Sequence, residues 1–152
     1  MTNILKTILI IIAITTNMGC DKNEVEPEAD YRIEFGSECG WCAGQEFISI
    51  NSSEINYIRN IPCGEEKGTI KKGRLLTSDE WNKITSSFDY SLFKTLDYSE
   101  CNVCADGCDE IIKITENNKT HELRYSLNDD VEGMQDLRMI LNDLLEKMRD
   151  TN

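Results

Sequence analysis

The sequence has little histidine and little proline, and each shortage excludes a kind of enzyme site. Among 152 residues there is one histidine, His121, and there are two prolines, Pro27 and Pro62. With one histidine and no activated serine near it in the pattern, no hydrolase constellation of nucleophile, base and orienting acid can be assembled. Because His121 alternates with Leu123 and Tyr125 in a strand-like segment, we expect it to be a half-buried structural ring.

Positive charge is also scarce. Lysine and arginine total 16 against 28 aspartates and glutamates, which gives a net charge of −12. A chain this acidic has no electrostatic footprint for nucleic acid and would be repelled by an anionic bilayer surface. If it binds a partner, its charge favours a basic protein, a cation or a neutral glycan.

Long apolar runs are absent too, since the longest, Ile8–Ile14, has seven residues. Seven residues are too few to cross about 30 Å of hydrocarbon as a helix, but they suit the hydrophobic region of a secretory signal. Lys6 precedes the run, and small and polar residues follow it before Gly19 and Cys20. The pattern predicts a signal peptide over residues 1–19.

The junction Gly19-Cys20 resembles the lipobox of bacterial lipoproteins. Asn17 and Met18 stand where most lipoboxes have leucine and a small residue, which resembles the relaxed lipoboxes of Bacteroidota. The resemblance implies cleavage before Cys20, acylation of that cysteine with chains such as palmitate, and anchoring in the outer membrane through those chains. The alternative is an ordinary secretory signal in which Cys20 is a chance cysteine.

The segment 20–30 is expected to be the lipidated cysteine followed by a flexible tether. Five of the ten residues 21–30 are acidic, and such a stretch cannot bury enough apolar surface to fold. An acidic stretch directly after the lipidated cysteine also resembles the surface-export signals of Bacteroidota lipoproteins, which implies exposure at the cell surface. The alternative is a solvated linker that carries no address.

The remaining residues, 31–152, are expected to form one cysteine-rich domain. An even number of cysteines in an exported domain favours structural disulfides, although the sequence cannot choose their pairing. These candidates are Cys39, Cys42, Cys63, Cys101, Cys104 and Cys108.

One alternative is a thiol-disulfide oxidoreductase that uses Cys39 and Cys42, the pair within CGWCAG. Its local layout superficially resembles a thioredoxin site. That chemistry needs a thiolate stabilised at a helix N-terminus, and a thioredoxin fold also needs a cis-proline facing the pair. Here a strand pattern follows Cys42, and Pro62 follows too soon and precedes another cysteine.

A second alternative is a structural zinc site. The two C-x-x-C units, Cys39/Cys42 and Cys101/Cys104, would supply the four thiolates of a tetrahedral site. This arrangement leaves two cysteines over and needs reduced thiols, which an exported protein does not guarantee. Outside this alternative the sequence calls for no metal or cofactor.

The order of strand and helix signals predicts the α+β class: an antiparallel sheet built from two hairpins plus a short strand, with two helices packed on one face. The short strand is expected over 31–35, and a polar edge strand is expected over 68–74. The hairpins are expected over 46–58 and 110–126.

Two helices are predicted from capping and periodicity. Thr77 and Glu80 fit a capping box that begins a helix over 78–87. Apolar residues from Met134 to Met148 step by three and four, which is typical of an amphipathic helix, and Asp129 or Asp130 is the expected N-cap.

Trp41 is the candidate contact residue, because an exposed aromatic side chain often contacts sugars or partner proteins. Packing over a disulfide is the alternative. Together the patterns favour a lipid-anchored envelope lipoprotein with a disulfide-stapled domain. Its expected role is non-catalytic binding or structure, with an envelope protein or a glycan as partner.

Overall fold

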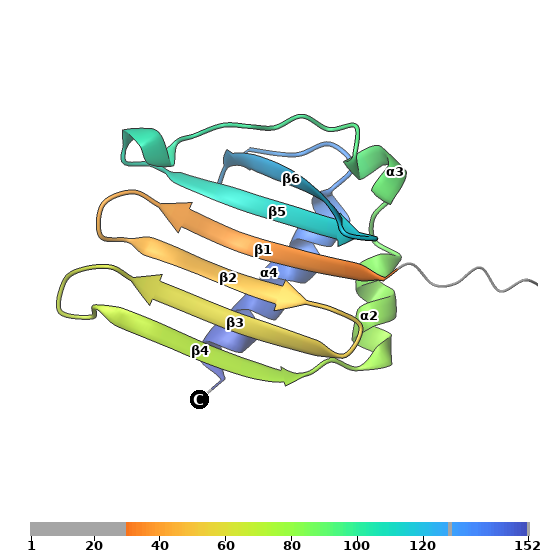
Figure 1. The fold of residues 1–152 in the computed structure, drawn as a ribbon, viewed down its shortest axis with the longest axis horizontal. Coiled ribbons are helices and arrows are strands. Elements are labelled where there is room, and N and C mark those ends of the chain that lie inside the picture. The colour runs from red at the N-terminus through yellow and green to blue at the C-terminus, as the bar shows by residue number, and fades with distance from the viewer. Residues whose placement is uncertain (1–29, 128, 152) are drawn as a thin grey trace, which may run out of the picture.

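The computed structural model describes residues 30–127 and 129–151, and their centre is one antiparallel sheet of six strands (Figure 1). The strand order is β4-β3-β2-β1-β5-β6, so the first strand in the chain lies at the centre. The strands are β1 (Tyr31–Cys39), β2 (Gly44–Ile50), β3 (Glu54–Ile61), β4 (Gly68–Leu75), β5 (Cys108–Glu116) and β6 (Lys119–Ser126).

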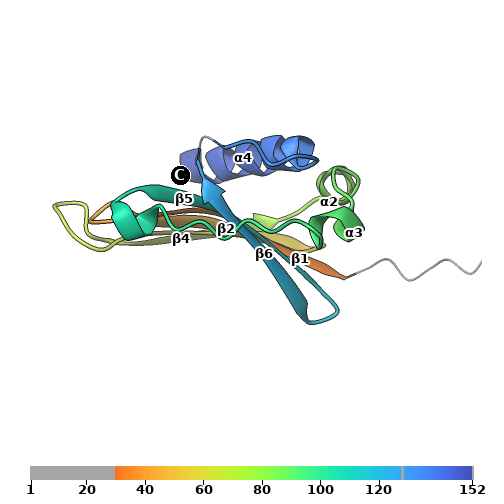
Figure 2. The ribbon, with the colours of Figure 1, turned by 90° about the horizontal axis from the view of Figure 1, so that it is seen from above.

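Helices α2 (Ser78–Thr85) and α4 (Gln135–Asp150) pack on one face of this sheet (Figure 2). A shorter helix, α3 (Tyr90–Phe93), and the 3-10 turn η2 (Val103–Ala105) lie in the connection between α2 and β5. Within the described residues, no helix covers the opposite face (Figure 2). The α+β class with helices on one face is therefore confirmed.

Strand β1 is not the short strand that the sequence predicts. It has nine residues and pairs along its length with β2 on one side and β5 on the other. Gly36 interrupts the apolar alternation that would have revealed this length. A Cβ on Gly36 would lie 2.7 Å from the Cα of Phe47 on β2, so the close approach of these strands requires glycine.

The core lies between the sheet and the helices, and alternate residues of the strands supply one side of it. Helix α4 contributes six buried residues at helical spacing, as its periodicity predicts. The central strands contribute the fully buried Ile33, Phe35, Ile48, Ile50, Ile112 and Ile114.

The predicted capping box of α2 is confirmed. The Thr77 hydroxyl accepts a hydrogen bond of 3.2 Å from the Glu80 backbone N–H, and the Glu80 carboxylate accepts one of 3.0 Å from the Thr77 backbone N–H. Arg74 at the end of β4 reaches the same carboxylate at 2.7 Å. Hydrogen bonding from Arg74 first, and from Thr77, lowers the pKa of Glu80 to about 2. The helix ends at Thr85, two residues earlier than predicted.

The expected N-cap of α4 is wrong. The helix begins at Gln135, with Met134 as N-cap and no side-chain capping hydrogen bond. Val131 and Met134 are buried in the core, so the segment before the helix continues as a packed loop instead of starting a turn of helix. The Asp129 carbonyl accepts a hydrogen bond of 2.6 Å from Arg138 inside α4.

The two ends of β1 separate two parts of the molecule. Tyr31 marks the end of the sheet at which the described chain enters, here called the entry end, and Cys39 lies at the opposite end (Figure 1). Eight residue-to-residue steps of ~3.3 Å place these two positions roughly 26 Å apart. The six cysteines of the domain lie at the end of Cys39, two of them as terminal residues of β1 and β5 and four in the loops.

Candidate functional site

Three segments meet at the end of the sheet opposite the entry end: the β1–β2 turn (40–43), the β3–β4 loop (62–67) and the loop before β5 (100–107) (Figure 1). We call these segments, with the six cysteines, the cysteine end. Three disulfides staple it: Cys39–Cys108, Cys42–Cys63 and Cys101–Cys104. The domain is thus disulfide-stabilised.

The three disulfides constrain the chain to different degrees, because they close loops of very different length. Cys39 and Cys108 are direct cross-strand partners and join β1 to β5 across a sequence separation of 69. Cys42–Cys63 joins the β1–β2 turn to the β3–β4 loop across 21 residues. The third bond spans a separation of only 3 within one turn.

The pairing removes the basis of both thiol-based alternatives. Cys39 and Cys42 belong to different disulfides, so they do not form the dithiol pair that an oxidoreductase at CGWCAG would need. The four sulfurs proposed for zinc are all in disulfide bonds. Across 30–127 and 129–151, no group of three or more histidine, cysteine, aspartate or glutamate side chains is placed to hold a metal ion.

Trp41 stands at the tip of the β1–β2 turn with 74% of its surface exposed. Its φ angle is 53°, in the left-handed region that bulky residues rarely adopt. Two disulfides flank it, and the Gly40 backbone N–H donates a hydrogen bond of 2.9 Å to the Gly107 carbonyl of the neighbouring loop. The turn therefore holds a large aromatic ring out to solvent on a restrained backbone.

The charge around this turn is mostly negative. Glu65, Glu66 and Asp106 are exposed in the two neighbouring loops, and Lys67 is the one exposed cation among residues 62–67. Asp106 is in the left-handed conformation, and a Cβ on Gly40 would lie 2.8 Å from the Asp106 Cα. The acidic loop thus packs directly beside the turn that carries Trp41.

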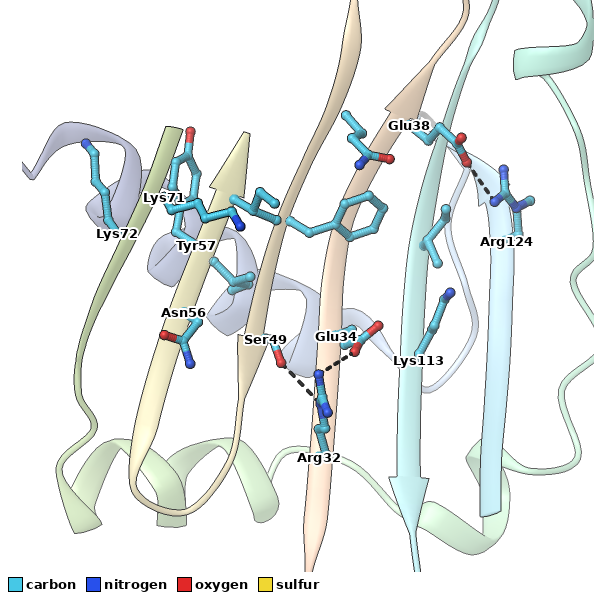
Figure 3. Close-up of a pocket in the computed structure, with 15 residues that line it drawn as sticks. Arg32, Glu34, Glu38, Ser49, Asn56, Tyr57, Lys71, Lys72, Lys113 and Arg124 are labelled. Atoms are coloured by element: carbon cyan, nitrogen blue, oxygen red, sulfur yellow. Dashed lines mark hydrogen bonds and ion pairs between the residues drawn. The ribbon is translucent and has the colours of Figure 1, made fainter. Parts of the chain in front are cut away.

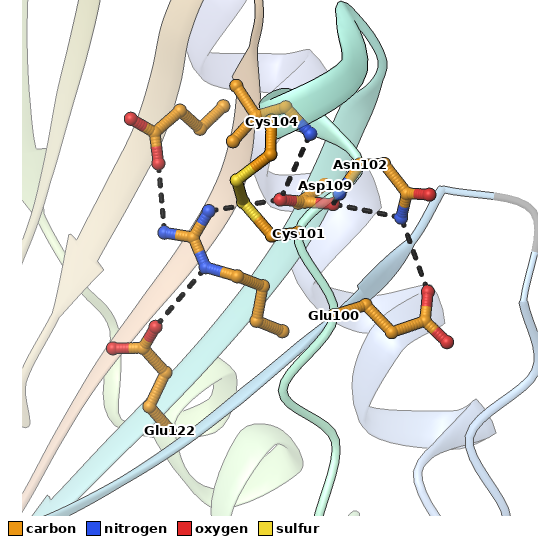
Figure 4. Close-up of a disulfide and its surroundings, with 9 residues drawn as sticks. Glu100, Cys101, Asn102, Cys104, Asp109 and Glu122 are labelled. Carbon is orange, nitrogen blue, oxygen red and sulfur yellow. Dashed lines mark hydrogen bonds and ion pairs between the residues drawn. A yellow bond between two sulfur atoms is a disulfide. The ribbon is translucent and has the colours of Figure 1, made fainter.

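Asp109 organises the loop before β5 from underneath (Figure 4). Its side chain is 0% exposed, and one carboxylate oxygen accepts hydrogen bonds from the Asn102 backbone N–H at 2.7 Å and the Asn102 side-chain amide at 2.9 Å. Arg124 on β6 reaches the other oxygen at 3.0 Å and also pairs with Glu38 at 2.9 Å.

These contacts keep Asp109 ionised despite its burial. Desolvation raises its pKa, but the hydrogen bonds from Asn102 and Arg124 together outweigh that effect, so the pKa lies below its usual value. Burial likewise opposes the charge of Arg124, and hydrogen bonds to Glu38 and Asp109 raise its pKa. The sequence pattern does not predict this network, because its residues are far apart in the chain: Glu38, Asn102, Asp109 and Arg124.

The uncovered face of the sheet carries a hollow of about 500 Å³ (Figure 3). Phe47, Ile58 and Ile111 line it among longer polar side chains. Two of its cations are in ion pairs: Arg32 lies 3.1 Å from Glu34, and Lys113 lies 3.1 Å from Glu122, while Lys71 and Lys72 also line the hollow. We place the candidate site at the cysteine end, where a restrained turn exposes Trp41.

His121 is the half-buried structural ring that the sequence predicts. Its Nε2 donates a hydrogen bond of 2.8 Å to the Leu96 carbonyl, and its ring packs edge-on against Phe93 with centroids 5.2 Å apart. The lipidation candidate Cys20, with the expected signal peptide and tether, lies outside the described residues. Within the described part of the chain, no helix has the length and apolar character needed to cross a membrane.

Comparison of the chain with known protein families and with curated proteins gave no match.

Proposed function

We propose that the chain is a lipid-anchored envelope lipoprotein whose disulfide-stapled domain is a non-catalytic binding module, with the cysteine end as its contact surface. The observation that carries the proposal is the position of Trp41: exposed, in the left-handed backbone region, and fixed between two disulfides. A left-handed conformation costs a bulky residue about 1–2 kcal/mol. Backbone strain of this kind gathers at functional sites.

A restrained, exposed tryptophan suits a binding surface for two reasons. Its ring supplies a large contact area, and tryptophan is among the side chains that most often dominate interface energetics. The two disulfides and the Gly40–Gly107 hydrogen bond order the turn before any partner arrives. Little further ordering entropy is then lost on binding.

The direction of β1 supports the same assignment. A chain anchored through Cys20 would approach the domain at Tyr31, at the entry end. The cysteine end lies at the far end of the sheet (Figure 1). The anchor would thus leave Trp41 pointing away from the bilayer and accessible to other components of the outer membrane or cell surface.

The partner class follows from charge. Glu65, Glu66 and Asp106 are exposed in the two loops next to the turn of Trp41, and the face of an aromatic ring attracts cations. We propose an envelope protein that presents a lysine- or arginine-rich segment to Trp41. Opposite charge would speed the encounter, and the ring would supply most of the affinity.

Site-specific crosslinking in the intact envelope tests the contact surface. The full chain carries a photo-reactive phenylalanine analogue in place of Trp41 or, as a matched control, in place of Leu75, which is 80% exposed at the entry end. We expect a discrete crosslinked protein only from position 41. Identical products from both positions, or none from position 41, would contradict the proposal.

Once that protein is identified, Trp41→Ala should weaken its binding by roughly 30-fold, the effect of losing a central aromatic contact of about 2 kcal/mol. Leu75→Ala should leave the dissociation constant unchanged. Both changes are at exposed positions, so the thermal midpoints of the variants should stay close to that of the parent. Equal affinity losses for both variants would remove Trp41 from the interface.

The anchor has its own test. Replacing Cys20 with alanine should move the protein from the membrane fraction to the soluble fraction and abolish its labelling by an alkyne-tagged palmitate fed to the cells. The Cys101→Ala/Cys104→Ala variant, which removes two other cysteines, should keep the label. Retention of both label and membrane association in Cys20→Ala would refute lipidation at this position.

A further inference from the structure

The Cys101–Cys104 disulfide differs from the other two in loop length and exposure. It closes a turn with a sequence separation of 3, against 21 and 69 for the others, and both of its cysteines are exposed. A disulfide that closes a short loop constrains the unfolded chain least. Exposed disulfides are also the more readily reduced class.

The turn around this disulfide is held by contacts that do not involve sulfur. The Asn102 carbonyl accepts backbone hydrogen bonds of 2.9 Å from Ala105 and 2.8 Å from Gly107. From below, the buried Asp109 carboxylate accepts the backbone and side-chain N–H groups of Asn102, and Arg124 fixes that carboxylate in turn (Figure 4). None of these contacts involves the S–S bond, so we expect them to remain when that bond is broken.

We propose that Cys101–Cys104 is a thiol–disulfide exchange site that accepts two electrons from a dithiol, while the other two disulfides remain structural. This goes beyond the binding role of Trp41, because it assigns a separate chemistry to the neighbouring loop. It also differs from the oxidoreductase considered for Cys39 and Cys42, whose sulfurs are committed to long-range staples.

The exchange balances in two steps. A thiolate of the dithiol attacks one sulfur of the pair, forms a mixed disulfide and releases the other cysteine as a thiolate, which takes up a proton. The second thiolate of the dithiol then attacks the dithiol sulfur that is bonded to the protein. This closes the dithiol's own disulfide and releases the remaining cysteine as a thiolate, which takes up a proton. The domain ends with two thiols and the dithiol ends as a disulfide.

Asp109 is the positioning residue in this proposal. By holding the Asn102 backbone, it keeps the two thiols of the reduced turn close together, so that the bond re-forms without refolding of the loop. Because each thiol of the reduced pair is at a high local concentration near the other, the Cys101–Cys104 disulfide can form again after reduction.

The test is selective reduction of the oxidised full chain with graded concentrations of dithiothreitol, followed by acid quenching, alkylation under denaturing conditions and peptide mapping. We expect alkylation of Cys101 and Cys104 at a concentration at least ten-fold lower than that needed for Cys42 and Cys63. The circular dichroism spectrum should not change at that point. The Cys42–Cys63 bond is a matched internal control because Cys42 is also exposed.

A second variant separates exchange from simple accessibility. Asp109→Asn removes the charge that holds the turn, so the equilibrium between the Cys101/Cys104 pair and dithiothreitol should shift several-fold toward the reduced protein. The Cys42/Cys63 equilibrium should not move. The proposal is overturned if Cys101–Cys104 opens together with or after the other bonds, if its reduction unfolds the sheet, or if Asp109→Asn shifts both equilibria equally.

Discussion

Replacing Cys39 and Cys108 together with alanine is expected to lower the free energy of unfolding by about 4 kcal/mol. The bond closes a loop with a sequence separation of 69, and in the chain-entropy description such a loop loses about that much entropy in the unfolded state. For a domain of about 120 residues, this corresponds to a fall of about 15 °C in the thermal midpoint. Urea and thermal unfolding of the oxidised protein measure both quantities.

The short bond provides the matched control. Cys101→Ala/Cys104→Ala removes a disulfide from the same end of the molecule, but its sequence separation of 3 predicts a loss of only about 2 kcal/mol. Equal losses for the two double variants would show that loop length does not govern the stabilisation. In that case local contacts at the cysteine end would set it.

Replacing Arg138 with methionine is expected to lower the free energy of unfolding by about 3–5 kcal/mol. This is the usual penalty for removing one partner of a buried ion pair. Glu110 on β5 is 4% exposed, and its carboxylate lies 2.6 Å from Arg138 Nε. Without the guanidinium, a buried carboxylate would remain, with the Tyr125 hydroxyl at 2.6 Å as its remaining side-chain donor. Arg138 also donates a hydrogen bond of 2.6 Å to the Leu127 carbonyl, which connects the segment before α4 to the helix.

Two further variants separate these contributions. Adding Glu110→Gln to Arg138→Met removes the stranded charge but keeps an acceptor for Tyr125, so at least half of the lost stability should return. Lys147→Met breaks the exposed Lys147–Asp143 pair, with its 2.6 Å contact, and should cost less than about 1 kcal/mol. A double variant that is no more stable than Arg138→Met alone would contradict the role of the buried charge.

The parts of the fold with strong local signals were predictable from sequence. The capping box at Thr77 and Glu80 and the three-and-four spacing within α4 depend on neighbouring residues, so a single stretch of sequence reveals them. The strand pairs β2–β3 and β5–β6 are hairpins between adjacent segments, and their turn residues mark them.

The parts that depend on distant residues were not predictable. The length of β1 depends on the fit of Gly36 beneath Phe47, and its central place depends on pairing with β5, more than 60 residues later. The disulfide pairing follows from that register, since Cys39 and Cys108 are cross-strand partners only once β1 and β5 align.

The candidate site was predictable only in part. Trp41 stood out as an aromatic between small residues and cysteines, and the structure shows it exposed. Its left-handed backbone and the Asp109 network are tertiary features. Asp109 lies among other acidic residues in the sequence, and only the folded chain brings Asn102 and Arg124 to its carboxylate.

The central position of β1 also bears on how the molecule is made. Synthesis and any export that starts at the N-terminus deliver Cys39 and Cys42 before other cysteines of the domain, so oxidation in order of appearance would join them to each other. The native bond of Cys39 must wait for Cys108, almost 70 residues later. Correct maturation therefore depends on reshuffling an early wrong bond or on keeping Cys39 reduced until β5 arrives. A cell that lacks disulfide isomerase activity should accumulate this protein in mispaired forms.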